Sequence, residues 1–286
     1  MAARLIINAD DFGLTPGVNR AIAELHRAGV LTSATLMATG PAFDDAVSLA
    51  KSLPRLGVGC HIVLTDGVPV SSPDEIPTLL GSDRVHFRPS LLDFVRDLLL
   101  GKIDEGEIER EALAQIQKLW RAGINVTHVD THKHTHLFPR VAGPLIGIIR
   151  RTSFVAIRNP FEPEFARRLP HTGLKRRLQI ALLNGFKTRF EKLATHTAST
   201  DGTVGISATG SLNATTLQQV FSSLPNEGTF ELVCHPGYHD ADLDRVTTRL
   251  RTHREIEREA LLSEVPKILS IPQPPELIHY GSLTAK

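Results

Sequence analysis

Carboxylates and imidazoles in this sequence gather where short apolar runs end. Four runs carry them. Arg4–Ala9 is followed by Asp10 and Asp11, Gly57–Leu64 contains His61, and Thr229–Cys234 is followed by His235. The fourth run, Asn125–Thr131, overlaps the motif T-H-V-D-T-H-K-H-T-H at 127–136. One carboxylate with two imidazoles is a mixed ligand set that suits Zn²⁺ and several other divalent ions, and it leaves positions free for water and substrate. These residue types therefore predict a catalytic metal site rather than a structural one.

His128, Asp130 and His132 share one face if residues 125–131 form a strand, because side chains alternate along a strand. Alternate residues lie about 6.6–6.8 Å apart, so the three cannot all bind one ion. His132 is the better ligand candidate because it lies nearest the end of the strand, and Asp130 or His128 would hydrogen bond to a ligand imidazole and fix its tautomer. His134 and Arg158 are further candidates for contacts with the ligands or the substrate.

Strands and helices alternate along the whole chain. Besides the four runs above, the predicted strands are Ser33–Met37, Phe154–Arg158, Gly202–Ala208 and Leu277–Tyr280. The predicted helices are Thr15–Gly29, Ala42–Leu53, Leu91–Leu100, Glu105–Ala122, Arg140–Arg151, Ala214–Ser223 with Asn213 as its cap, and Arg251–Ser263. Seven or eight such repeats without a linker favour an α/β fold of one domain, a closed or nearly closed TIM-like (β/α) barrel. Active sites of such barrels form at the carboxyl ends of the strands, where the carboxylates and imidazoles lie.

The composition excludes several classes of protein. The chain has 286 residues, 41% of them hydrophobic, and its 32 Lys and Arg nearly balance 31 Asp and Glu. We therefore expect a globular protein without the global charge that attracts nucleic acid. Two cysteines, no secretory pattern near the start and no apolar stretch of about 18 residues predict a cytoplasmic protein that does not span a membrane. Strand alternation turns the thiols of Cys60 and Cys234 outward, under the helices.

The four blocks of polar residues carry a resemblance to a known family. N-A-D-D-F-G at 8–13, the run with His61 before L-T-D-G at 64–67, T-H-x-D-T-H-x-H-x-H at 127–136 and C-H-P at 234–236 resemble the YdjC-like carbohydrate deacetylases in order and spacing. The resemblance runs from residue 4 to about residue 238 and is weaker over 163–228. It implies a distorted (β/α) barrel that removes acetyl from an N-acetylated sugar, either a chito-oligosaccharide or an N-acetylglucosaminyl glycolipid.

The resemblance also implies a role for each matched residue. Asp11, His61 and His132 would hold one divalent ion, with Zn, Mg, Mn, Co and Ni not distinguished. Asp10 would be the general base and His235 the general acid, on opposite sides of the scissile amide. The sequence departs from the chito-oligosaccharide enzymes at 131 and 133, where it has Thr and Lys in place of Ser and His, so the sugar remains open.

Other interpretations of these residues also remain open. Asp10 and Asp11 could cap the helix that follows, His61 could be a core histidine, the 128–136 cluster could be a surface loop, and His235-Pro236 could be a turn. If no active site were present, each of the four strand ends would need its own separate explanation of this kind. The His128–Asp130 pair could also join a distal imidazole in a two-His-one-carboxylate iron oxygenase. Alternatively, the barrel could bind carbohydrate without catalysis, although binding alone needs no base such as Asp10.

Two segments interrupt the repeat of strands and helices. The loop 66–88 is long for a structural connection and is a candidate substrate loop. The insertion 163–193 is helical and basic: residues 167–192 hold eight Lys and Arg against Glu191, with Leu174, Leu178 and Leu182 at helical spacing. This helix either docks on the barrel with a solvated basic face or rests on an anionic bilayer at the inner membrane face. A homodimer also stays open.

Overall fold

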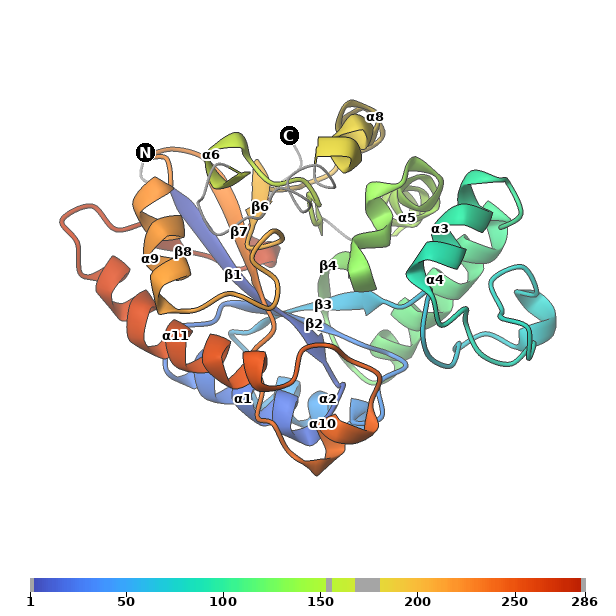
Figure 1. The fold of residues 1–286 in the computed structure, drawn as a ribbon, viewed down its shortest axis with the longest axis horizontal. Helices are drawn as coiled ribbons and strands as arrows, with labels where there is room; N and C mark the ends of the chain where they lie inside the picture. The colour runs from blue at the N-terminus through green and yellow to red at the C-terminus, as the bar shows by residue number, and fades with distance from the viewer. Residues whose placement is uncertain (1–2, 153–155, 168–180, 284–286) are drawn as a thin grey trace.

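Parallel strands form one curled sheet with helices packed around its outer side (Figure 1). The computed structural model describes residues 3–152, 156–167 and 181–283. The strands are β1 (Arg4–Phe12), β2 (Ser33–Leu36), β3 (Gly57–Ile62), β4 (Val126–Thr131), β5 (Ala156–Ile157), β6 (Gly202–Val204), β7 (Thr229–Cys234) and β8 (Glu276–Leu277). They pair in the order β5-β4-β3-β2-β1-β7-β6, and β8 pairs with the start of β1.

The curled sheet confirms the predicted (β/α) barrel and shows how it is distorted. Every strand pairing is parallel, as expected when helices connect the strands. In the part of the chain that the structure describes, no ladder joins β5 to β6. Instead Ala156 of β5 forms a single bridge with Ala198, so the wall of the barrel is irregular on that side.

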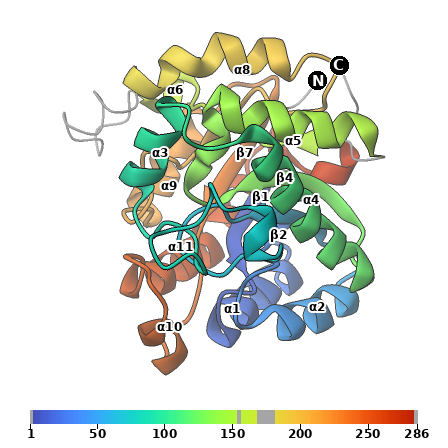
Figure 2. The same cartoon turned by 90° about the vertical axis from the view of Figure 1, so that its right-hand side faces the viewer.

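The helices cover the sheet in the predicted alternation (Figure 2). Their bounds are α1 (Pro16–Arg27), α2 (Phe43–Ser52), α3 (Leu91–Leu99), α4 (Glu105–Arg121), α5 (Pro139–Arg151), α6 (Glu164–Arg167), α8 (Lys187–Leu193), α9 (Ala214–Ser223), α10 (Ala241–Arg245) and α11 (Thr252–Leu269), with short 3₁₀ turns η1 (Pro73–Glu75), η2 (His132–Leu137), η3 (Asn184–Phe186) and η4 (Tyr280–Ser282). Asn213 caps α9 as predicted, since its side chain accepts a hydrogen bond from the amide of Thr216 at 3.0 Å.

Helix α11 is longer than the sequence predicts, since its expected end lies at Ser263. The helix instead continues to Leu269. Leu261 and Val265 are fully buried on this helix. Val265 lies in the added turn, and burial of its side chain contributes to the stability of the helix past Pro266, which cannot donate a backbone hydrogen bond.

Strand β1 also exceeds its predicted end at Ala9. It runs to Phe12 through a β-bulge between Ala9 and Phe12, where Asp11 has a φ of 66°. A bulge places two consecutive residues opposite one and redirects their side chains. Asp10 and Asp11 therefore lie within the last residues of the strand, both buried, rather than in a loop after it.

The two cysteines lie in the hydrophobic layer between sheet and helices, as strand alternation predicts. Cys60 and Cys234 are fully buried and unpaired with each other. Burial raises the pKa of both thiols well above the ordinary value. A thiol must be accessible and deprotonated to react, so neither condition is met in the native protein.

We expect native protein to react slowly with an aromatic disulfide reagent at pH 8, and little faster at pH 9 because both thiol pKa values lie higher still. The absorbance of the released thiolate measures the reaction, and protein unfolded in guanidinium should release two equivalents rapidly. Fast labelling of native Cys60 or Cys234 would contradict the strand register.

The basic insertion is only partly within the described residues. Residues 168–180, with Leu174 and four of the eight basic residues, lie outside them. In the described part, Phe186 contacts Phe138 with ring centroids 5.3 Å apart, and Phe190 of α8 is buried. This end of the insertion therefore packs on the barrel.

Candidate active site

The polar blocks predicted from the sequence meet at the carboxyl ends of neighbouring strands. His61 of β3 pairs in register with Asp130 of β4, and β1 brings Asp10 and Asp11 beside them across β2. His132 follows β4 directly as the first residue of η2. The next residues, Lys133 and His134, adopt left-handed φ values of 57° and 52°, which turn the chain sharply after His132.

Three side-chain atoms converge to form a candidate metal centre. Asp11 Oδ1 lies 3.6 Å from His61 Nε2 and 3.4 Å from His132 Nδ1, and the two imidazole nitrogens are 3.3 Å apart. Ligands about 2.0–2.2 Å from a tetrahedral ion are separated by about 3.3–3.6 Å. The three atoms therefore already have the mutual spacing of metal ligands.

His61 is oriented by Asp130, which the sequence analysis left as one of two candidates for this role. Asp130 Oδ1 lies 2.8 Å from His61 Nδ1, which directs Nε2 toward Asp11 and His132. Burial by itself lowers the pKa of His61, but Asp130 and Asp10 outweigh it and raise this pKa to about 9. A metal ion at Nε2 would have to displace this proton.

The oxygens of Asp11 differ in their contacts. Oδ2 accepts a hydrogen bond from Arg254 Nη2 of α11 at 2.6 Å, whereas Oδ1 is buried without a hydrogen-bond partner. Burial raises the pKa of Asp11, but Arg254 and His132 hold it well below the usual value, so Asp11 is an anion. An unpartnered buried oxygen is costly, and a cation beside it would remove that cost.

A second set of acidic residues surrounds the buried Arg158. Its guanidinium contacts Asp10 at 2.6 and 3.0 Å, Asp130 at 2.6 Å and Glu231 of β7 at 2.7 to 3.0 Å. Asp10, His61 and Asp130 could also surround an ion, but the carboxylates of this set are already bound to Arg158. The set that contains Asp11 is therefore the better candidate for a metal centre, because it still offers a carboxylate oxygen without a hydrogen-bond partner.

Asp10 and His235 are closer together than the sequence analysis expects. His235 Nε2 lies 3.7 Å from Asp10 Oδ2, so the two side chains are neighbours in the site. Arg158 and the neighbouring imidazoles hold the pKa of Asp10 far below its usual value against the opposing effect of burial, and burial lowers the pKa of His235. Asp10 is thus an anion beside a neutral imidazole.

His128 lies deeper in the barrel, away from the candidate ligands. Its ring stacks on Tyr280 with centroids 3.8 Å apart, and its Nε2 lies 3.3 Å from Asn8 Oδ1. Gly59 leaves the space for this ring, because a Cβ there would approach the ring atoms to 2.5–2.6 Å. Of the two predicted orienting residues, only Asp130 contacts a candidate ligand. His134 has a buried Nδ1 without a hydrogen-bond partner.

Several buried polar residues of the site were missed by the sequence analysis. They are Arg254 on Asp11, Glu257, whose Oε2 accepts the backbone N–H of His235 at 2.6 Å, and Tyr280, which donates to Glu231. A signal existed for Glu231, a lone charge inside the apolar run of β7. None existed for Arg254 and Glu257, which share a helix with many exposed charges.

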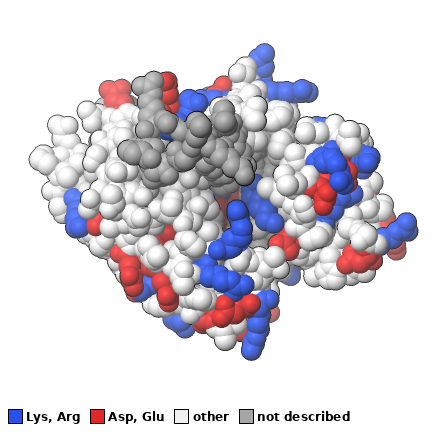
Figure 3. Space-filling model, viewed as in Figure 1, with Lys and Arg blue, Asp and Glu red and all other residues white. Residues whose placement is uncertain are grey.

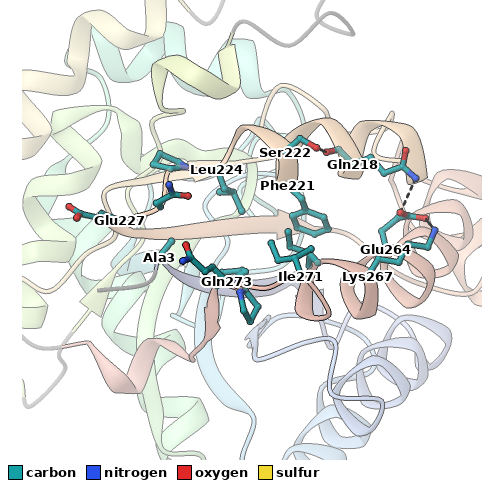
Figure 4. A pocket seen from close by; sticks show the side chains of 15 residues that line it. Ala3, Gln218, Phe221, Ser222, Leu224, Glu227, Glu264, Lys267, Ile271 and Gln273 are labelled. Carbon is teal, nitrogen blue, oxygen red and sulfur yellow. Dashed lines mark hydrogen bonds and ion pairs between the residues drawn. The ribbon is translucent and has the colours of Figure 1, made fainter.

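A groove of about 1020 Å³ lies at the other end of the strands (Figure 4). Phe221, Leu224 and Ile271 line it, together with Glu264, which binds Gln218 and Lys267. It runs between α9, α11 and the segment before β8, at the amino ends of the strands. We do not assign the active site to it, since barrel active sites form at the carboxyl ends.

Surface charge is mixed on the face seen in Figure 3, where Lys and Arg lie among Asp and Glu over the described residues. No helix among the described residues has both the length and the apolar character needed to cross a membrane.

Comparison with known proteins connects this site to one family. The family described as YdjC-like protein matches residues 4–269. A protein named carbohydrate deacetylase from Brevibacillus brevis is 44% identical over 158 residues, which cover 55% of this chain and 60% of that relative. Another of the same name, from Thermoanaerobacter pseudethanolicus, is 31% identical over 90% of both chains. A crystal structure named as a cellobiose-phosphate cleavage protein from Enterococcus faecalis V583 matches with a TM-score of 0.78 and 25% identity over 99% of both chains.

Proposed function

The chain belongs to the YdjC-like protein family, and from this premise we propose that it is a metal-dependent hydrolase that removes the acetyl group from an N-acetylated sugar. The observation that carries the proposal is the convergence of Asp11, His61 and His132 beside the Asp10–His235 pair. The names of the relatives support a carbohydrate as the substrate.

The residues present fit a divalent ion. Asp11 Oδ1 is buried and unpartnered, and it faces two imidazole nitrogens at ligand spacing. The buried cluster also contains more acidic groups than guanidinium groups, namely Asp10, Asp11, Asp130 and Glu231 against Arg158 and Arg254. When bound, such an ion supplies Lewis acidity toward the acetamide carbonyl and lowers the pKa of water toward about 7.

Asp10 and His235 would move the protons of the reaction. Asp10 Oδ2 takes a proton from the attacking water, whose oxygen bonds to the acetyl carbon. His235 Nε2 lies 3.7 Å from Asp10 Oδ2 and would receive this proton from it. His235 then protonates the nitrogen as the C–N bond breaks, which gives the free amine and acetic acid, and the acid loses its proton to become acetate at neutral pH. A relay of this kind needs the pair adjacent rather than on opposite sides of the amide.

Asp130 and Arg158 would position these groups. Asp130 fixes the tautomer of His61, and Arg158 holds both oxygens of Asp10 in place. Thr35 Oγ1 lies 3.3 Å from Asp10 Oδ1 and 3.2 Å from Asp130 Oδ2, so its one proton can be donated to either carboxylate. The carboxylates therefore keep their places when a substrate enters.

The alternatives from the sequence analysis are less well supported. An iron oxygenase built on His128 and Asp130 has no support, since His128 stacks on Tyr280 away from the cluster and Asp130 is bound to Arg158. A barrel that only binds carbohydrate has no use for a proton-accepting pair such as Asp10 and His235.

Acetate release tests the proposal. We expect dialysed protein reloaded with Zn²⁺, Mn²⁺ or Co²⁺ to release acetate from N-acetylglucosamine oligomers, and protein kept with chelator to lose that activity. Acetate is measured with a coupled enzymatic assay, and dissolved oxygen is followed in parallel. Oxygen consumption, or binding of the oligomers without acetate, would favour one of the two alternatives.

Other features of the sequence analysis stay predictions. They are a cytoplasmic location, a homodimer, contact of residues 167–192 with an anionic bilayer, a substrate role for the loop 66–88, and the choice between oligosaccharide and glycolipid. Sedimentation with anionic vesicles at low and high salt tests the bilayer contact.

A further inference from the structure

Arg254 of α11 is a buried cation that reaches the candidate metal centre from the C-terminal part of the chain. We propose that Arg254 is a positioning residue that restricts Asp11 to one ligating oxygen and so keeps a coordination position of the metal open. The inference rests on the proposed function, since it takes Asp11, His61 and His132 as the metal ligands.

The contact divides the carboxylate of Asp11 into two unequal oxygens. Arg254 Nη2 lies 2.6 Å from Oδ2, and both side chains are almost fully buried. Oδ1 is left without a hydrogen bond, 3.4 Å from His132 Nδ1 and 3.6 Å from His61 Nε2. A charge-assisted hydrogen bond is short and directional, so Oδ2 is held away from the centre while Oδ1 faces it.

The loop after β7 packs against Arg254 and holds its side chain in position to reach Asp11. Arg254 Nε donates to the carbonyl of Leu250 at 3.0 Å, and the amide of Gly237 donates to the carbonyl of Arg254 at 3.2 Å. A Cβ at Gly237 would lie 3.0 Å from Arg254 Cδ and 3.1 Å from Val18. A glycine at 237 therefore leaves room for the arginine beneath the segment that carries His235.

The number of ligating oxygens decides how many positions stay free. Carboxylates bind metals through one oxygen or two, and a catalytic site must keep a position for water or substrate. Without Arg254, Oδ2 of Asp11 would be free to turn toward the ion as a second ligand. The guanidinium thus prevents Oδ2 of Asp11 from occupying the coordination position that water or substrate needs.

Metal affinity alone cannot test this role. Losing Arg254 removes a positive charge that repels the ion and adds a ligand oxygen, so binding should stay as tight or become tighter. A merely structural tether predicts the opposite, because a mobile Asp11 should bind more weakly. The coordination of the ion must therefore be measured directly.

The test uses Co²⁺, whose visible absorption weakens as its coordination number rises. We expect the full-length Arg254→Met variant to bind one Co²⁺ per chain with a dissociation constant no weaker than wild type, but with weaker and shifted visible bands. Its kcat for acetate release should fall about 10–100-fold, the usual effect of losing a group that orients a metal ligand. Arg258→Met is the matched control, since Arg258 lies one turn further on α11 and contacts Glu24 at 3.0 Å.

Each outcome decides the proposal. An unchanged Co²⁺ spectrum, with either unchanged or weaker binding, would overturn it, as would the same spectral shift in Arg258→Met. If circular dichroism shows that Arg254→Met does not fold, Arg254→Lys takes its place under the same spectral criterion, because lysine keeps the positive charge but lacks the guanidinium Nη2 that binds Asp11 Oδ2. Wild-type protein that binds none of Co²⁺, Zn²⁺ and Mn²⁺ would instead refute the proposed function.

Discussion

Asp10→Asn should lower kcat for acetate release by about 10²–10⁴-fold, the usual contribution of a general base. An amide in place of the carboxylate cannot take the proton of the attacking water or pass it to His235 Nε2. Arg158 would keep its contacts to Asp130 and Glu231, so the variant should fold. Metal content should stay at the wild-type value, because Asp10 is not among the assigned ligands.

The measurement is acetate release at saturating substrate, with metal content and thermal unfolding followed on the same preparations. Asp97→Asn is the matched control: Asp97 is also buried and paired with arginines, Arg88 at 3.2 Å and Arg96 at 3.1 Å, but it belongs to α3. Asp97→Asn should keep its activity. Near-normal acetate release by Asp10→Asn would remove Asp10 from the reaction.

His61→Ala and His132→Ala should each lose both the metal and the activity. With two protein ligands left in place of three, metal content after dialysis should fall below about a tenth of the wild-type value. The stabilisation by added metal should fall as well, which for wild type amounts to about 2.7 kcal/mol at a free metal concentration of 100 times Kd.

Elemental analysis and thermal unfolding with and without added metal check these two variants. His239→Ala is the control, because His239 pairs with Asp244 at the surface, 2.9 Å away. It should keep the wild-type metal content. If His61→Ala and His132→Ala also keep it, the metal centre lies elsewhere, and the set of Asp10, His61 and Asp130 fails with it, since both share His61.

Local sequence patterns predicted most of the elements and the end of the barrel that carries the site. An apolar run of strand length and a helical period can each be recognised within about ten consecutive residues. The predicted bounds of β7 and α9 therefore agree with the structure. The period of two along a strand also placed Cys60 and Cys234 in the outer layer. The rule that barrel sites form at carboxyl ends placed Asp11, His61 and His132 in one candidate site with Asp10 and His235, and the resemblance to the YdjC-like family selected the three as metal ligands.

Only the tertiary structure decided which of these side chains touch. Asp130 rather than His128 orients His61 because the register of β3 and β4 sets the two opposite each other. The bulge in β1, which no local pattern marked, brings Asp11 as well as Asp10 into the site. The contact of Arg254 with Asp11 joins residues 243 positions apart, and that of His235 with Asp10 crosses from β7 to β1. Such contacts depend on strand register and helix packing over the whole barrel, and a local sequence period carries no information about either.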